Sequence, residues 1–154
     1  EYEPLSTEQA ITYCAFLKDW FERHNIEVIR TGLQSTEELD SGNSLVAGPY
    51  EPAMGELVVN EQYKQRIERC INEHIESFIN KELSQWNIWG QANTFIALNI
   101  SIFYPRSLTS KVRGLKNRNM LYFQEKYPHV NINWYEDSTR NTVRCCIDGL
   151  QYVL

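Results

Sequence analysis

The stretch Lys111–Arg118 combines one glycine, one asparagine and four cations, and these residue types together can bind phosphate groups. Gly114 lacks a Cβ, so another backbone can approach it closely. A helix starting just after it would point free N–H groups at an anion. Lys116 and Arg118 add charge whose binding to phosphates releases counterions. The residues expected to contact phosphate groups are Lys111, Arg113, Gly114, Leu115, Lys116, Asn117 and Arg118.

The distribution of charge along the chain singles out the same stretch. The net charge is −5, yet the thirteen residues from Arg106 to Arg118 hold five cations and no acid. The chain has 15 Lys and Arg, so without these five only 10 oppose 20 Asp and Glu. One basic patch on an acidic body gives a directional field for anionic partners. The alternative is that Gly114 forms a plain turn between helices and that the cations are merely solvated.

Short elements with alternating or helical periodicity flank this loop. Residues 94–104 alternate as a strand, with Ile100 and Ile102 on one face, and Pro105 ends it. Two short helices are expected around Leu108–Val112 and Met120–Phe123. Residues 130–136 read as a second strand, and a third starts at Val143. The opposite sheet face would carry Phe95, Phe103, Tyr135 and Arg144, which could stack bases or pack on another part of the protein.

The order strand, helix, loop, helix, strand, together with V-x-G-x-x-N-x-x-M at Val112–Met120, resembles the core of a KH RNA-binding domain. In that family a G-x-x-G loop between two short helices clamps a nucleic-acid backbone. The resemblance implies that the residues of the 111–118 stretch contact RNA. Asn117 replaces the second glycine; asparagine tolerates the left-handed backbone next best, although its Cβ would crowd a phosphate. A degenerate KH-like fold that binds protein therefore stays open as an alternative.

The N-terminal third is expected to contain one helix, one strand and a long loop. Ser6–Gln9 has the form of a capping box for a helix ending near His24. Residues 26–29 predict a short strand, and glycines and prolines punctuate residues 30–55. Asn60 is the expected N-cap of a long amphipathic helix over 61–83, which would cover the sheet.

A second resemblance covers residues 28–58. The segments R-T-G-L-Q at Arg30–Gln34, T-E-E-L at Thr36–Leu39 and A-G-P-Y-E-P-A-M-G-E-L-V at Ala47–Val58 resemble the part that closes the catalytic region in radical-SAM proteins related to the Elongator catalytic subunit. The family typically reads R-x-G-L-Q, T-E-E-L and A-G-P-Y-H-P-A-F-x-E-L-V. Here Glu51 replaces the usual histidine and Met54 the usual phenylalanine.

This second resemblance implies that the chain is the C-terminal portion of an RNA-modifying enzyme, with tRNA the expected RNA. Relatives hold a [4Fe-4S] cluster on a C-x-x-x-C-x-x-C motif and cleave S-adenosylmethionine. This chain lacks the motif, so both cofactors are expected in an upstream domain of the full-length protein, and the chain alone should be inactive. Arg30 and Gln34 follow the expected strand end, where barrel enzymes keep ligand-binding groups.

The composition and the predicted elements together indicate a cellular location and a fold class for this protein. No apolar run approaches the ~20 residues that span a membrane, and the four cysteines form no C-x-x-C pair. We expect reduced cysteines and a cytoplasmic protein. The expected fold class is α+β: residues 1–58 form the barrel-closing segment and 59–154 a KH-like domain with its covering helix. A phage or viral assembly subunit is a further alternative.

Overall fold

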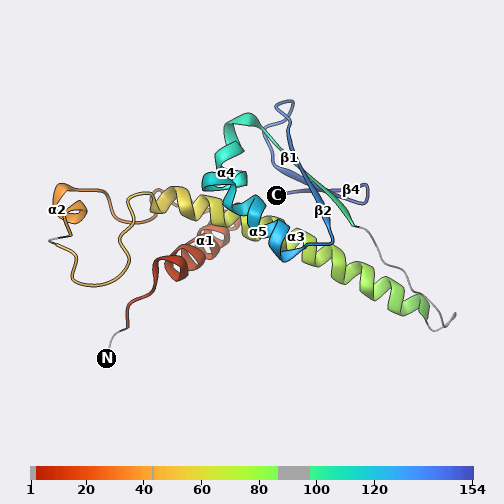
Figure 1. The fold of residues 1–154 in the computed structure, drawn as a ribbon, viewed down its shortest axis with the longest axis horizontal. Coiled ribbons are helices and arrows are strands. Elements are labelled where there is room, and N and C mark those ends of the chain that lie inside the picture. Colours follow the sequence, from red (N-terminus) through yellow and green to blue (C-terminus); the bar gives the residue numbers. More distant parts are fainter. Residues whose placement is uncertain (1–2, 43, 87–97) are drawn as a thin grey trace.

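The computed structural model describes residues 3–42, 44–86 and 98–154, which form helices and one four-stranded mixed sheet (Figure 1). The α+β class expected from the sequence is confirmed. The helices are α1 (Thr7–Arg23), α2 (Glu37–Asp40), α3 (Met54–Trp86), α4 (Thr109–Arg113) and α5 (Arg118–Lys126). The strands are β1 (Asn99–Tyr104), β2 (Asn131–Glu136), β3 (Arg144–Ile147) and β4 (Leu150–Val153).

The sheet has the strand order β2-β1-β3-β4. Strand β1 pairs in parallel with β2, and the short helices α4 and α5 make the connection between them. The β1–β3 and β3–β4 pairs are antiparallel. Asp148 and Gly149 both have positive φ, and they turn the chain between β3 and β4. Residues 94–97 of the expected first strand lie outside the described residues.

The main core lies between one face of the sheet and helices α3, α4 and α5. Ile100 and Ile102 of β1 are fully buried against Ile67 and Ile71 of α3. Val112 of α4 and Phe123 of α5 close the same core at 0% exposure. The apolar face of the long helix thus covers the sheet, as its periodicity predicts.

A smaller apolar cluster joins α1 to the first turns of α3. Ala15 and Val58 are fully buried there, with Ala10, Ile11 and Met54 around them. The capping box is confirmed, since Ser6 Oγ accepts from the Gln9 N–H and the Gln9 side chain accepts from the Ser6 N–H. The expected boundary between residues 58 and 59 falls inside α3, which contacts both α1 and the sheet.

Asp19 ties α1 to α3 electrostatically. It is 3% exposed, and its carboxylate accepts from Arg66 Nε at 2.6 Å and from Arg69 Nη2 at 2.9 Å. Burial alone would raise the pKa of Asp19, but the hydrogen bonds and charges of Arg66 and Arg69 outweigh burial and lower it. Glu22 accepts from Arg66 Nη2 at 3.0 Å and extends the network.

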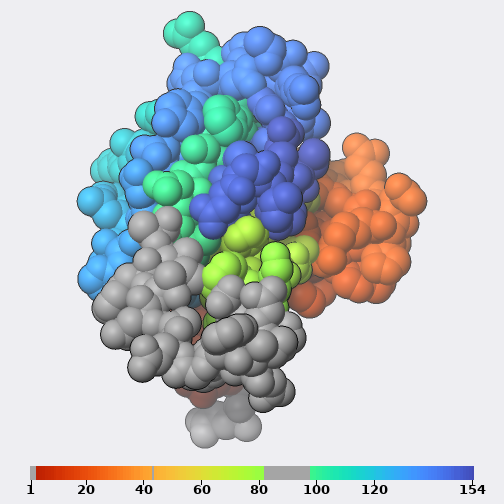
Figure 2. All heavy atoms as spheres, turned by 90° about the vertical axis from the view of Figure 1, so that its right-hand side faces the viewer, coloured from red at the N-terminus to blue at the C-terminus, as the bar shows by residue number. Residues whose placement is uncertain are grey.

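Two sequence expectations are wrong. Residues 26–29 form no strand, and Ile29 is 92% exposed, because none of the strands in the described part of the chain pairs with them. Asn60 is not an N-cap, because α3 begins at Met54, six residues earlier. The Ala53 N–H donates to the Glu51 side chain just before that start. In Figure 1 the connection between α1 and α3, which carries α2, extends to the left, away from the sheet. In Figure 2 the orange part of the chain, near the end of α1, stands out to the right of the sheet.

Candidate nucleic-acid interface

The backbone breaks sharply between α4 and α5, at the position that the glycine predicts. Gly114 has φ 76° and ψ 163°, and a single 3₁₀ turn follows at Leu115–Asn117. Lys116 (φ 52°, ψ 33°) and Asn117 (φ 62°, ψ 25°) both lie in the left-handed region. Asparagine therefore does support the left-handed backbone at the position of the second glycine.

Two buried asparagines hold this loop from below. Asn119 Nδ2 donates to Val112 O at 3.0 Å and to Asn60 O at 2.8 Å. The Asn60 amide, oriented to satisfy its partners, donates to Ser110 O and Lys111 O and accepts from the Leu115 N–H, each at 3.2 Å. The loop is thus fixed by hydrogen bonds to α3, from a residue fifty positions earlier.

Gly114 is itself buried, and its missing side chain faces the protein. A Cβ at this position would lie 3.0 Å from Asn119 Cγ and 3.1 Å from Asn119 N. The glycine is therefore required by the packing of Asn119 and by its positive φ. The loop surface left to a ligand is formed by the exposed residues Leu115–Arg118.

The cations around the loop fall into two groups. Lys111 and Lys116 are exposed and have no ion pair or hydrogen-bond partner among the residues that the structure describes. Arg113 donates to the Tyr104 hydroxyl and lies over that ring, with 5.5 Å from Cζ to the centroid. Arg118 Nη2 donates to Glu8 Oε1 of α1 at 2.7 Å. The free cations are thus available to an anion, whereas Arg118 must first leave Glu8.

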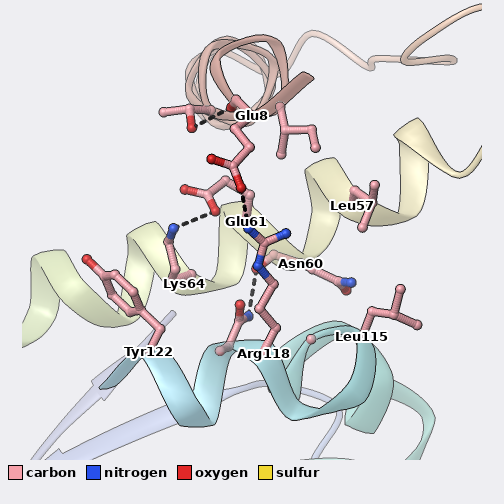
Figure 3. A pocket seen from close by; sticks show the side chains of 12 residues that line it. Glu8, Leu57, Asn60, Glu61, Lys64, Leu115, Arg118 and Tyr122 are labelled. Atoms are coloured by element: carbon pink, nitrogen blue, oxygen red, sulfur yellow. Dashed lines mark hydrogen bonds and ion pairs between the residues drawn. The ribbon is translucent and has the colours of Figure 1, made fainter. Parts of the chain in front are cut away.

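A groove of about 280 Å³ lies between this loop and the N-terminal helices (Figure 3). Helix α3 forms its floor, α1 forms one wall, and the loop with α5 forms the other. The Arg118–Glu8 ion pair bridges the two walls in the figure. The lining residues are Glu8, Ile11, Thr12, Leu57, Asn60, Glu61, Lys64, Gly114, Leu115, Arg118, Asn119 and Tyr122.

Arg30 and Gln34 do not reach this groove. Arg30 Nη1 donates to Gln34 Oε1 at 2.9 Å, and both side chains are exposed on the projecting segment. The strand end on which their expected ligand-facing position depended is not formed.

The outer sheet face carries an aromatic ladder. The Phe103 and Tyr135 rings stack with centroids 5.2 Å apart, and the Arg144 guanidinium lies 5.3 Å from the Phe103 centroid. Arg144 also pairs with Asp137, so its charge is already neutralised. Phe95 lies outside the described residues. These side chains form a cross-strand stack whose charge offers little to a phosphate.

The cysteines and the other potential metal ligands do not form a cluster site. All four cysteines are free; Cys70 and Cys145 are buried, and Cys14 and Cys146 are half-buried. In the described ranges no three His, Cys, Asp or Glu side chains are arranged to hold a metal ion. The residues present do not fit an iron–sulfur cluster. No helix in these ranges is long and apolar enough to cross a membrane.

Comparison with known proteins gave no match to any family model, curated protein or solved structure.

Sequence reasoning missed the residues that shape the site from outside the loop. Asn60, Asn119, Glu8 and Leu57 come from three separate helices, and no local spacing links them. Of these four residues, Asn119 could have been found from local sequence, since it is a polar residue beside the apolar positions of a short helix.

Proposed function

We propose that this chain is the RNA-binding C-terminal region of a radical-SAM RNA-modifying enzyme, and that its RNA is a tRNA. The observation that carries the proposal is the loop itself. A helix break at Gly114 presents Lys111 and Lys116, both exposed and without an anionic partner in the described chain, on a protein of net charge −5. Such a local positive field attracts a polyanion while the acidic remainder repels it elsewhere.

The apolar surface of the N-terminal third supports an upstream domain. Tyr13, Phe16, Leu17 and Trp20 follow helical spacing on the outer face of α1 and are 42–56% exposed. Ile29 is 92% and Val46 100% exposed on the projecting segment. A continuous apolar face of this kind is typical of a surface that another domain covers. In the proposal that domain holds the [4Fe-4S] cluster and S-adenosylmethionine, in the cytoplasm.

Electrophoretic mobility shift with tRNA tests the RNA-binding proposal. The double variant Lys111→Gln/Lys116→Gln should weaken binding and reduce the slope of log K against log salt by about 1.4 to 1.8, since each phosphate contact contributes about 0.7 to 0.9. The matched control Lys81→Gln/Arg140→Gln removes two charges outside the loop and should keep the wild-type slope. Equal slopes for both variants would refute phosphate contact at the loop.

The upstream coding sequence tests the enzyme part of the proposal. A C-x-x-x-C-x-x-C triad is expected before Glu1 in the natural gene. An upstream region without such a triad removes the radical-SAM assignment and leaves the RNA-binding part to stand alone.

One observation favours a second candidate, a protein-interaction module with a degenerate KH-like fold. Gly114 is buried under Asn119, and the Leu115 N–H is occupied by Asn60, so part of the loop backbone is satisfied within the protein. This candidate predicts no tRNA shift at low or at high salt, whereas phosphate contact gives a shift that weakens with salt.

A further inference from the structure

The groove under the loop has a different character from the loop's outer rim. It lies on the side of α4 and α5 that faces the N-terminal helices, between the loop and α1, with α3 beneath it (Figure 3). Ile11 and Leu57 contribute apolar atoms from the helices. Leu115, at the loop apex, is 50% exposed and lines the groove from the other wall. These three side chains offer surface on which a flat, weakly polar group can pack.

The charges that line the groove are paired with one another, unlike the lysines outside it. Two acids and two cations line it, and they pair: Arg118 with Glu8 at 2.7 Å and Lys64 with Glu61 at 2.6 Å. The groove therefore carries no net charge. Lys111 of α4 and Lys116 of the loop, which have no ion pair among the described residues, lie outside its lining. A phosphate backbone gains most along those lysines, and the neutral part of a nucleotide fits the groove.

Two groups of the lining could hold a ligand through the ligand's hydrogen-bond donors. The carboxylates of Glu8 and Glu61 accept hydrogen bonds only, and each oxygen can accept more than one. Exocyclic amino groups of adenine, cytosine and guanine are donors of this kind, as in the pairing of Glu or Asp with cytosine N4. Uracil has no amino group.

The bridge between the walls can open. Arg118 and Glu8 are 66% and 78% exposed, and a solvent-exposed ion pair contributes little to stability. Once released, the Arg118 guanidinium remains at the loop, where a phosphate can replace Glu8 as its partner.

We infer that this groove receives one unpaired, amino-bearing base of the bound RNA, with its phosphates along the outer loop. The inference rests on the proposed function and names which part of the RNA the protein reads. It places Leu115, Leu57 and Glu8 at the base, and Lys111 and Lys116 at the backbone.

Fluorescence anisotropy with short labelled oligo(C), oligo(A) and oligo(U) tests the inference on the full chain. Leu115→Ser should weaken binding of oligo(C) about tenfold, the scale of losing one packed base. The matched control Leu121→Ser changes a leucine of α5 that is also exposed (60%) and does not line the groove, and it should bind like wild type. Equal affinities for the two variants overturn the inference.

A block from the opposite wall tests the same groove without altering the loop. Thr12 is exposed on α1 and lines the groove, so Thr12→Trp should fill it and also weaken oligo(C) binding about tenfold. Wild-type protein should bind oligo(U) more weakly than oligo(C), with no further loss on Thr12→Trp. Oligo(U) binding equal to oligo(C) binding overturns the assigned base class.

The two proposals fail in different ways. If wild-type protein binds none of the oligonucleotides or tRNA at low salt, the RNA-binding function itself is wrong. If binding is salt-dependent and sensitive to Lys111→Gln/Lys116→Gln but not to Leu115→Ser or Thr12→Trp, the function stands and the groove inference is wrong.

Discussion

At the scale of single residues, Gly114 and Asn119 act as a pair. Sequence pattern attributes the glycine to close approach of a phosphate, yet its missing Cβ faces Asn119, whose amide holds Val112 O and Asn60 O. Packing alone therefore accounts for a glycine at this position. The proposal of an anion site therefore rests on the exposed lysines near the glycine, Lys111 and Lys116.

Gly114→Ala should destabilise the protein by about 3 kcal/mol, because it combines a glycine-only backbone region with contacts at 3.0–3.1 Å to Asn119. Gly149→Ala is the matched control: its φ of 86° is also positive, but nothing lies within 4 Å of the added Cβ, so about 1 kcal/mol is expected. Urea denaturation measures both. Equal losses would mean that Asn119 does not depend on the glycine.

Asp19 gives the molecule a specific sensitivity to acid. Its folded-state pKa is lowered, because the Arg66 and Arg69 hydrogen bonds outweigh burial. Its stabilising contribution is therefore complete above the unfolded pKa of about 3.9 and is lost as pH falls through the lower folded value.

Asp19→Asn should cost about 2 kcal/mol at pH 7, and the difference from wild type should shrink as pH falls below about 4. Urea denaturation at a series of pH values measures it. Glu125→Gln, at an exposed carboxylate with no ion pair among the described residues, should follow the wild-type curve. A difference that stays constant down to pH 3 contradicts the argument.

At the scale of elements, the sequence predicted those helix caps, breaks and strands that depend on residues close together in the chain. The capping box at Ser6, the break at Gly114 and the strands β1, β2 and β3 are all found near their expected positions. Strand β4 was missed although Asp148-Gly149 is a hairpin turn signal. The wrong expectations concern long-range partners: a strand at 26–29 needs a neighbour, and the partners of Asn60 lie at 110–115.

Asn60→Ala separates the two roles of this residue. An N-cap loss would cost about 1 kcal/mol and shorten the helix. Inside α3, alanine improves helix propensity but leaves Ser110 O, Lys111 O and the Leu115 N–H unpaired, so a loss of about 2 kcal/mol is expected.

Asn80→Ala provides the control, because Asn80 is exposed on the same helix; it should be neutral or slightly stabilising. Circular dichroism should show undiminished helix content for Asn60→Ala. Similar effects of the two substitutions would contradict the role of Asn60 under the loop.

At the scale of the whole molecule, packing is uneven. The sheet and its three covering helices share a large core, whereas α1 holds to α3 through a small apolar cluster and the Asp19 network. Residues 26–35 have no regular structure and few backbone hydrogen bonds to other segments. The described residues between α1 and α3 are thus less packed than the sheet and its covering helices, and Ile26, Ile29 and Val46 are exposed there.

Hydrogen exchange followed by mass spectrometry should register this contrast. Among the residues that the structure describes, amides of residues 26–35 should exchange faster than those of β1, β3 and the middle of α3, because exchange follows local opening. In a longer protein that includes the proposed upstream domain, residues 26–29 should become protected, since a barrel strand pairs its backbone with a neighbour. The slow exchange of amides in the core should be the same in both proteins and serves as the internal control.

Unchanged fast exchange at 26–29 in the longer protein would show that no strand forms there, and the proposed barrel-closing role of the N-terminal third would be wrong.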